Sequence, residues 1–287
     1  MPFVYAVPMK LTILGSGGFR RTPRPGCHCA VCEEMRSTGQ QRLGCALFLH
    51  DINALFDAPE EIAAELEHAG IHRMDHLFFT HWHPDHTLGA RILEIMNTQW
   101  AEKLEWRMVA VHKTEVHMPG LVHDEMMSRF GPFFEFWQHL GIADVHKMDG
   151  PVAAGKISID AIVFETKHRT MTHSTAYIIT GNGKKFVYAP CDITPFPKDE
   201  RFHGCDLMVL QVGWCGEEMA QRARNGPHYE ISMEEILDIA REYRPGRVVL
   251  THIGDEAKLL QADIANLEKK HSEHNLQFAW DGMTIEL

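Results

Sequence analysis

The stretch Thr80-His81-Trp82-His83-Pro84-Asp85-His86 places four side chains that can bind a metal within six residues. It follows an apolar run, 76–79, which predicts a short buried β-strand. Polar groups presented just past a strand are held on a rigid scaffold, as functional groups commonly are. Neutral imidazoles together with a carboxylate suit zinc, manganese or iron. The stretch therefore predicts a metal site, and a loop with chance histidines is the weaker interpretation because crowded histidines need partners.

Apolar runs of strand length recur along the 287 residues, with helical patterns between them. This interleaving predicts one α/β domain with two packed sheets. Strands are expected at 11–14, 45–49, 54–56, 76–80, 108–111, 157–166, 176–180, 186–188, 207–210, 248–251, 277–280 and 283–287. Helices are expected over 59–69, 88–96, 114–140 and 233–243. No apolar run approaches the length that crosses a bilayer, and residues 1–8 lack a secretory pattern, so a cytoplasmic location without membrane contact is expected.

The spacing His81-x-His83-x-Asp85-His86 resembles the signature of the metallo-β-lactamase superfamily. The resemblance implies an αββα sandwich, with two packed mixed sheets and helices on the outer faces. It also implies two adjacent metal ions, the first bound by the first two histidines and the second by Asp85 and His86. We expect residues 1–8 to form an N-terminal extension and residues 9–287 a single domain of this fold, in which 100–151 is a helical insertion or lid candidate.

The resemblance implies further ligands from later strands, and the sequence offers them in order. His168 follows the strand at 157–166, Asp192 follows 186–188 as the bridging carboxylate, and His252 follows 248–251. His173 is the alternative to His168. We favour His168 because it comes directly off the preceding strand, whereas His173 adjoins the start of the next one. The expected ligands are thus His81, His83, Asp85, His86, His168, Asp192 and His252.

A second cluster, Cys27-His28-Cys29-Ala30-Val31-Cys32, holds three of the seven cysteines. In a cytosolic chain such spacing favours a metal over a disulfide. The cluster resembles the structural zinc site of PhnP-type phosphodiesterases, which completes three cysteines with a histidine three residues past the last active-site histidine. That position here is Asp255. A structural zinc is therefore expected on Cys27, Cys29, Cys32 and Asp255, with His28 or water as alternative fourth ligands and unligated thiols as the weaker interpretation.

The PhnP-type resemblance implies a phosphodiesterase that opens a cyclic phosphodiester on a ribose. Two metals, manganese or zinc with iron as a further option, would activate a bridging water for attack on phosphorus. His228 stands where that family carries its proton-donating histidine, and we expect it to act with Asp85 as a catalytic residue. Asp57 and Asp75 are expected either to orient ligand histidines or to be exposed loop carboxylates, with neither alternative favoured. The expected substrate is a small (cyclic) ribose phosphate or nucleotide-like phosphodiester.

The formal net charge of −11 argues against a broad basic surface for long nucleic acids. A tRNA-processing-type nuclease of the same fold is an alternative that this acidic balance disfavours. A thioester or lactone hydrolase is another alternative within the superfamily. A non-enzymatic binding member predicts missing ligands, whereas the set appears complete. The Met- and Phe-rich stretch from Met118 to Trp137 is expected to be helical core, with a lid or a homodimer contact as the minority interpretation.

Overall fold

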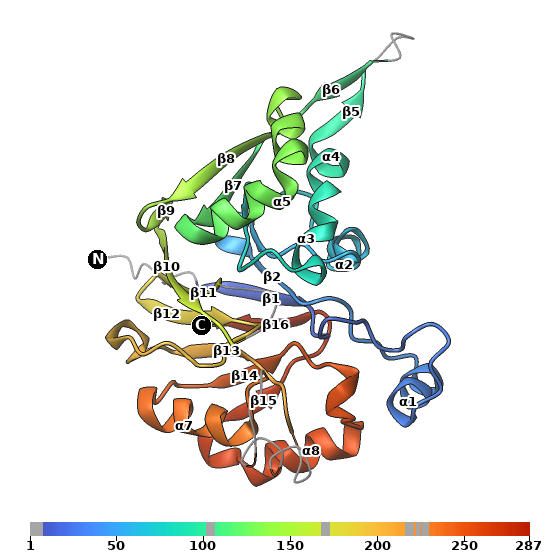
Figure 1. Cartoon of the computed structure of the whole chain (residues 1–287), viewed down its shortest axis with the longest axis vertical. Helices are drawn as coiled ribbons and strands as arrows, with labels where there is room; N and C mark the ends of the chain where they lie inside the picture. The colour runs from blue at the N-terminus through green and yellow to red at the C-terminus, as the bar shows by residue number, and fades with distance from the viewer. Residues whose placement is uncertain (1–7, 102–106, 168–172, 216–220, 222–224, 226–229) are drawn as a thin grey trace, which may run out of the picture.

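The computed structural model describes residues 8–101, 107–167, 173–215, 221, 225 and 230–287. They form two seven-stranded mixed sheets, with helices on both outer faces (Figure 1). A core of buried side chains from both sheets fills the space between them, and two further cores join each sheet to its own helices. The predicted αββα sandwich is confirmed.

The first sheet carries the histidine-rich stretch. Its order is β16-β1-β2-β3-β4-β7-β8, antiparallel from β16 to β3 and parallel from β3 to β8. The strand bounds are β1 Lys10–Gly15, β2 Ala46–Leu49, β3 Ala54–Phe56, β4 His76–Phe78, β7 Thr114–Pro119, β8 Ala143–Met148 and β16 Met283–Glu286. Because β3 and β4 are parallel, the loops that follow them meet at one edge, where Asp57 reaches the histidine-rich loop.

The second sheet carries the later predicted ligands. Its order is β15-β14-β13-β12-β11-β10-β9, parallel from β15 to β12 and antiparallel from β12 to β9. The bounds are β9 Val152–Ala154, β10 Ile157–Glu165, β11 His173–Gly181, β12 Lys184–Ala189, β13 Leu207–Gln211, β14 Val248–Thr251 and β15 Leu276–Phe278. The parallel arrangement puts the carboxyl ends of β12, β13 and β14 at one edge.

The helices cover the outer faces of the sandwich. Helices α2, α4 and α5 pack on the first sheet and α7 and α8 on the second, while α1 projects from the body (Figure 1). The α-helices are α1 Ala30–Thr38, α2 Ile62–His68, α3 Pro84–Thr87, α4 Ile92–Asn97, α5 Gly120–His139, α7 Met233–Tyr243 and α8 Gln261–Lys270. Short 3₁₀ turns are η1 His50–Ile52, η2 Leu88–Arg91, η3 Glu200–Phe202, η4 Asp255–Ala257 and η5 Ser272–His274.

The segment 100–151 is only partly helical. Strand β5 (Thr98–Trp100) pairs with β6 (Met108–Ala110) in a separate ribbon, and β7 and β8 belong to the first sheet. The helix expected over 114–140 begins only at Gly120, because the residues before it pair with β4 and β8. Helix α5 buries Val122, Met126, Phe134 and Trp137 against the first sheet, as expected for core.

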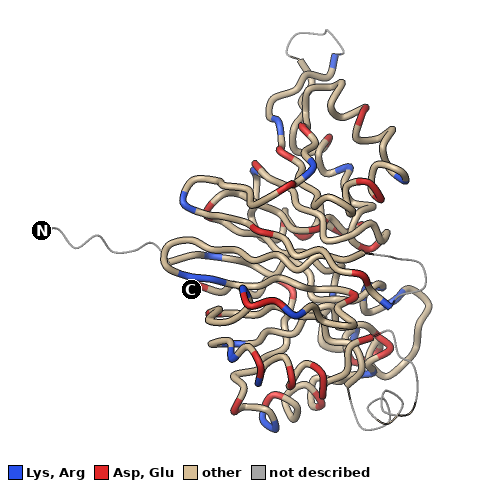
Figure 2. The backbone as a smooth tube through the Cα atoms, turned by 60° about the vertical axis from the view of Figure 1, so that its left-hand side comes forward, with Lys and Arg blue, Asp and Glu red and all other residues tan. Residues whose placement is uncertain are grey.

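The described helices include none that is long and apolar enough to cross a membrane. Acidic and basic residues are interspersed over both halves of the described chain (Figure 2).

Candidate metal centre

Most of the predicted ligands lie just past the ends of three strands. The stretch 81–86 follows β4, Asp192 follows β12, and His252 follows β14. Asp192 and His252 adopt positive φ angles of 51° and 58°, which residues other than glycine rarely do. Such strain persists where the surrounding structure fixes it, often at functional sites. Both predicted ligands are thus held in the left-handed backbone conformation just past their strands.

Six of the predicted ligands form two groups that adjoin. His81, His83 and Asp192 each offer one ligand atom within 4.8 Å of the others, and so do Asp85, His86 and His252. In the first group His83 Nδ1 lies 3.4 Å from Asp192 Oδ2. In the second, Asp85 Oδ2 lies 3.4 Å from the Nε2 atoms of both histidines. The rings of His81 and His86, one from each group, have centroids 4.3 Å apart.

The inward-facing nitrogens fit divalent metal ions. The Nε2 atoms of His81, His86 and His252 are buried and have no hydrogen-bond partner among the described residues. An unpaired buried imidazole nitrogen is costly, and metal coordination removes that cost. Two of these histidines are held from behind, since His81 Nδ1 lies 2.9 Å from Thr80 Oγ1 and His86 Nδ1 lies 2.9 Å from Asp57 Oδ2. This is how metal-binding histidines are usually oriented.

Asp57 orients both His81 and His86. Its fully buried carboxylate accepts from the Thr80 amide at 2.8 Å and from the Thr80 hydroxyl at 2.9 Å, as well as from His86. Because Thr80 Oγ1 donates to Asp57, it accepts from His81 Nδ1–H, which leaves Nε2 of His81 as the free ligand atom. The expected role of Asp75 is wrong, since its carboxylate instead contacts Asn53, Arg73 and His112.

The electrostatics of the centre reflect imidazoles and carboxylates packed together. Burial lowers the pKa of His86, but the carboxylates of Asp85 and Asp57 outweigh it and raise that pKa to about 9. Burial and the neighbouring His86 instead hold the pKa of His81 well below its ordinary value. Burial raises the pKa of Asp85, yet the nearby histidines more than offset it and the net shift is downward.

Sequence reasoning missed three polar residues beside the ligands. The Cys191 sulfur lies within 4.8 Å of the ligand atoms of His81 and His86. Gln211, at the end of β13, accepts from the Ile193 amide and donates to Glu230 Oε2 at 2.6 Å. Burial raises the pKa of Glu230 to about 7. The sequence signal that could have identified Gln211 was its position at the end of β13, which lies between the strands that Asp192 and His252 follow.

Two predicted residues, His168 and His228, lie outside the described residues. The alternative third ligand, His173, opens β11, and its Nδ1 lies 3.0 Å from Glu125 Oε1 on α5. His173 belongs to neither of the two ligand groups found in the described part of the chain. The preference for His168 stays a prediction.

The three cysteines form a separate group at the start of α1, with their sulfurs within 4.8 Å of one another. Asp255 does not complete this group, because its carboxylate contacts Arg20 and Arg24 at 3.1 Å each. Arg24 lies between the two, donating from Nη2 to Cys27 Sγ at 3.3 Å. The alternative ligand His28 is exposed and contacts Glu33 at 2.8 Å. Hydrogen bonds from the Cys29 backbone and from Arg24 lower the pKa of Cys27 to about 6, which favours the metal-binding thiolate.

Two mixed sheets between helices, with histidine and aspartate groups gathered at the strand ends, define a metallo-β-lactamase fold. The sequence model of the family described as the beta-lactamase superfamily domain matches residues 52–253. The chain therefore belongs to this family. Its fold is that of metal-dependent hydrolases that bind divalent ions.

Solved structures of this fold align over almost the whole chain. A diphosphatase from the PhnP family matches with a TM-score of 0.73 and 19% identity over 98% of both chains. Zinc-bound PqqB from Methylobacterium extorquens matches with a TM-score of 0.74 and 17% identity, over 97% of this chain and 100% of that chain. The short form of human tRNase Z matches with a TM-score of 0.63 and 17% identity, over 96% of this chain and 98% of that chain. At these identities the likeness shows the fold alone.

One curated sequence, an octanoyltransferase of Porphyromonas gingivalis, is 31% identical over 83 residues. The match spans 28% of this chain and 17% of that protein.

Proposed function

We propose that the chain is a binuclear metal-dependent phosphodiesterase acting on a small phosphorylated substrate, such as a cyclic ribose phosphate or a nucleotide-like diester. The observation that carries the proposal is the pair of adjoining ligand groups, His81–His83–Asp192 and Asp85–His86–His252. Two ions side by side suit attack on phosphorus, where both the attacking and the leaving oxygen carry charge. The likeness to a diphosphatase of the PhnP family supports a phosphorus centre.

In this proposal, each ligand group holds one divalent ion, manganese or zinc, with His168 completing the first group. Bound ions supply the acidity that activates a water molecule, and they neutralise charge on the phosphoryl oxygens. Asp57 and Thr80 keep His81 and His86 in the tautomer that presents Nε2 to the ions. His228 donates a proton to the leaving oxygen.

The cysteine group holds a structural zinc through Cys27, Cys29 and Cys32 in the same proposal. Asp255 contacts arginines and His28 contacts Glu33, so we assign the fourth position to a water molecule. Three thiolates with one exchangeable ligand still satisfy the tetrahedral preference of zinc. The net charge of −11 favours a small substrate over a long nucleic acid.

A hydrolysis panel with added Mn²⁺ or Zn²⁺ tests the proposal. It contains cyclic ribose phosphates, linear phosphodiesters, diphosphates, a thioester and a lactone. Phosphodiester cleavage is expected, and Asp192→Ala should abolish it while Asp149→Ala, at an exposed site outside the centre, should not. Turnover of the thioester or lactone alone would instead assign the chain to those hydrolases of the fold.

A further inference from the structure

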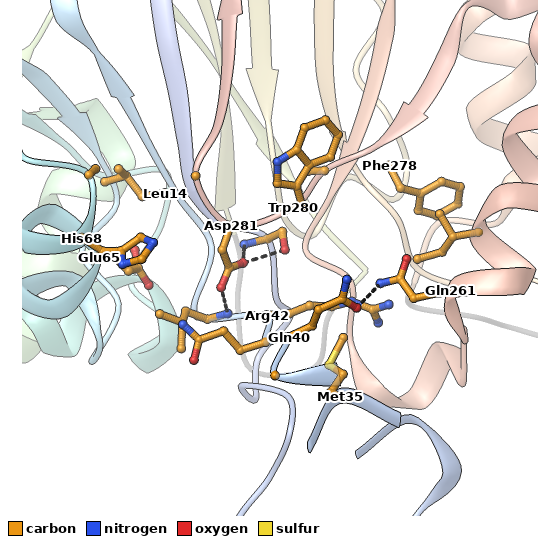
Figure 3. A pocket seen from close by; sticks show the side chains of 18 of the residues that line it. Leu14, Met35, Gln40, Arg42, Glu65, His68, Gln261, Phe278, Trp280 and Asp281 are labelled. Carbon is orange, nitrogen blue, oxygen red and sulfur yellow. Dashed lines mark hydrogen bonds between the residues drawn. The ribbon is translucent and has the colours of Figure 1, made fainter. Parts of the chain in front are cut away.

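A cavity of about 680 Å³ has no predicted metal ligand among its lining residues (Figure 3). It opens between the end of α1, helix α2, helix α8 and the loop that precedes β16. Its volume falls within the usual range for small-molecule sites.

Arg42 supplies a buried cation to this cavity. The residue is 3% exposed, its Nη2 donates to the Leu259 carbonyl at 3.2 Å, and its Nη1 has no hydrogen-bond partner among the described residues. Leaving a buried guanidinium nitrogen unpaired is costly, and a carboxylate is its best-matched partner. The carboxylates of Asp281 and Glu34 act on Arg42 electrostatically, yet Nη1 has no hydrogen-bond partner among the described residues, so this wall still offers a donor to an anionic group.

Glu65 supplies a buried carboxyl group. It is 3% exposed, and neither carboxyl oxygen has a hydrogen-bond partner within the described chain. Asp281 lies close by and accepts from Ser16 and from the Leu43 amide. In Figure 3 the Arg42 side chain lies on the other side of Asp281 from Glu65. Two carboxyl groups, one of them without any partner, fit a group that donates several hydrogen bonds and carries positive charge, as an ammonium does.

Apolar side chains line the rest of the cavity. Leu14, Met35 and Phe278 contribute to its walls, and Trp280, 57% exposed, stands over it (Figure 3). An exposed indole face beside carboxyl groups attracts an ammonium and covers hydrocarbon. The site thus offers an anion partner, an ammonium partner and an apolar surface between them.

We infer that this cavity binds a small zwitterionic amino compound, with its carboxylate on Arg42, its ammonium group at Glu65 and Asp281, and its hydrocarbon part against Trp280. Ordered water alone would satisfy the same polar atoms without selecting zwitterions. Selective binding of molecules that carry both charges therefore distinguishes a zwitterion site from a cavity filled only with ordered water.

Isothermal titration calorimetry on the intact chain, without any phosphorylated substrate, tests this inference independently of the proposed activity. The probes are 6-aminohexanoate, L-phenylalanine and the dipeptide Gly-Phe. Hexanoate, phenylpropionate, hexylamine and phenethylamine are the single-charge controls. At least one zwitterion should bind roughly tenfold or more tightly than its controls, because each control leaves one buried partner unpaired.

Two variants locate the binding. Arg42→Gln should weaken it by about tenfold or more, since a charge-assisted hydrogen bond is lost. Because a buried substitution can unfold the chain, Trp280→Ala at an exposed ring gives a second reading and should weaken it several-fold. Trp100→Ala, at another exposed tryptophan on β5, is the matched control and should leave the binding unchanged. Equal binding of zwitterions and single-charge controls, no binding at all, or indifference to Trp280→Ala in a folded variant would overturn the inference.

Discussion

His86 donates from Nδ1 to Asp57 at 2.9 Å, while its Nε2 points to Asp85 at 3.4 Å. Asp57 therefore orients a predicted metal ligand although it belongs to neither ligand group itself. It also reaches His81 through the Thr80 hydroxyl. One buried carboxylate thus sets the orientation of a histidine in each ligand group.

Asp57→Asn should lower metal affinity by roughly tenfold to a hundredfold, because an amide presents a donor where His86 Nδ1–H needs an acceptor. The measurement is competitive titration with a chelator, followed by metal analysis. Asp75→Asn is the matched control, since Asp75 contacts no predicted ligand. Equal affinities in the two variants would show that Asp57 does not orient the centre.

His228→Ala should slow hydrolysis of an alkyl or ribose phosphodiester by roughly a hundredfold or more, because a poor leaving group needs a proton. A nitrophenyl ester leaves without that proton, so its rate should fall much less. Metal content should not change. Equal losses on both substrates, or loss of metal, would assign His228 to binding rather than to proton donation.

Cys32→Ser should remove one zinc per chain and lower the free energy of unfolding, because zinc held by thiolates from the folded chain contributes its binding free energy to folding. Asp255→Ala should leave the zinc content unchanged, since that carboxylate contacts arginines. Elemental analysis of both variants gives the comparison. If Asp255→Ala loses the zinc and Cys32→Ser keeps it, the three-sulfur assignment is wrong.

His117 makes stability depend on pH. Burial, with His76 and His146 beside it, lowers its pKa from 6.5 to about 3. The unfolded chain then binds the proton first, so stability is full above pH 6.5 and falls as the pH drops below it. For this group alone the loss between pH 7.5 and 5.5 is about 1.4 kcal/mol. The His117 ring stacks on Phe78, and its Nε2 lies 3.2 Å from His76 Nδ1. The neighbouring His146 contacts Glu115.

Urea unfolding at these two pH values measures the effect. His117→Gln should remove about that much of the difference between them, whereas His139→Gln, at an exposed position on α5, should not. An unchanged pH difference in His117→Gln would refute the assignment.

The sequence alone allowed the fold and the arrangement of the centre to be predicted because both follow from local patterns. The run 76–79 and the loop 81–86 are contiguous, and Asp192 and His252 each directly follow a predicted strand. The ligand roles themselves stay predictions.

Contacts between distant segments were not predictable in this way. Arg24 contacts Asp255 across more than two hundred residues, and Gln211 at the end of β13 contacts Glu230, which is 19 residues further along the chain. The start of α5 was also misplaced, because pairing of β7 with its neighbours overrides the helical spacing before Gly120.

Metal stoichiometry in the centre tests the central claim most directly. Metal-replete protein should show two anomalous peaks, one between His83 and Asp192 and one between Asp85 and His252. Elemental analysis should give two ions per chain beyond the one on the cysteines. Asp192→Ala should lose the first peak while the fold survives. A single peak, or none between His83 and Asp192, would contradict the binuclear account.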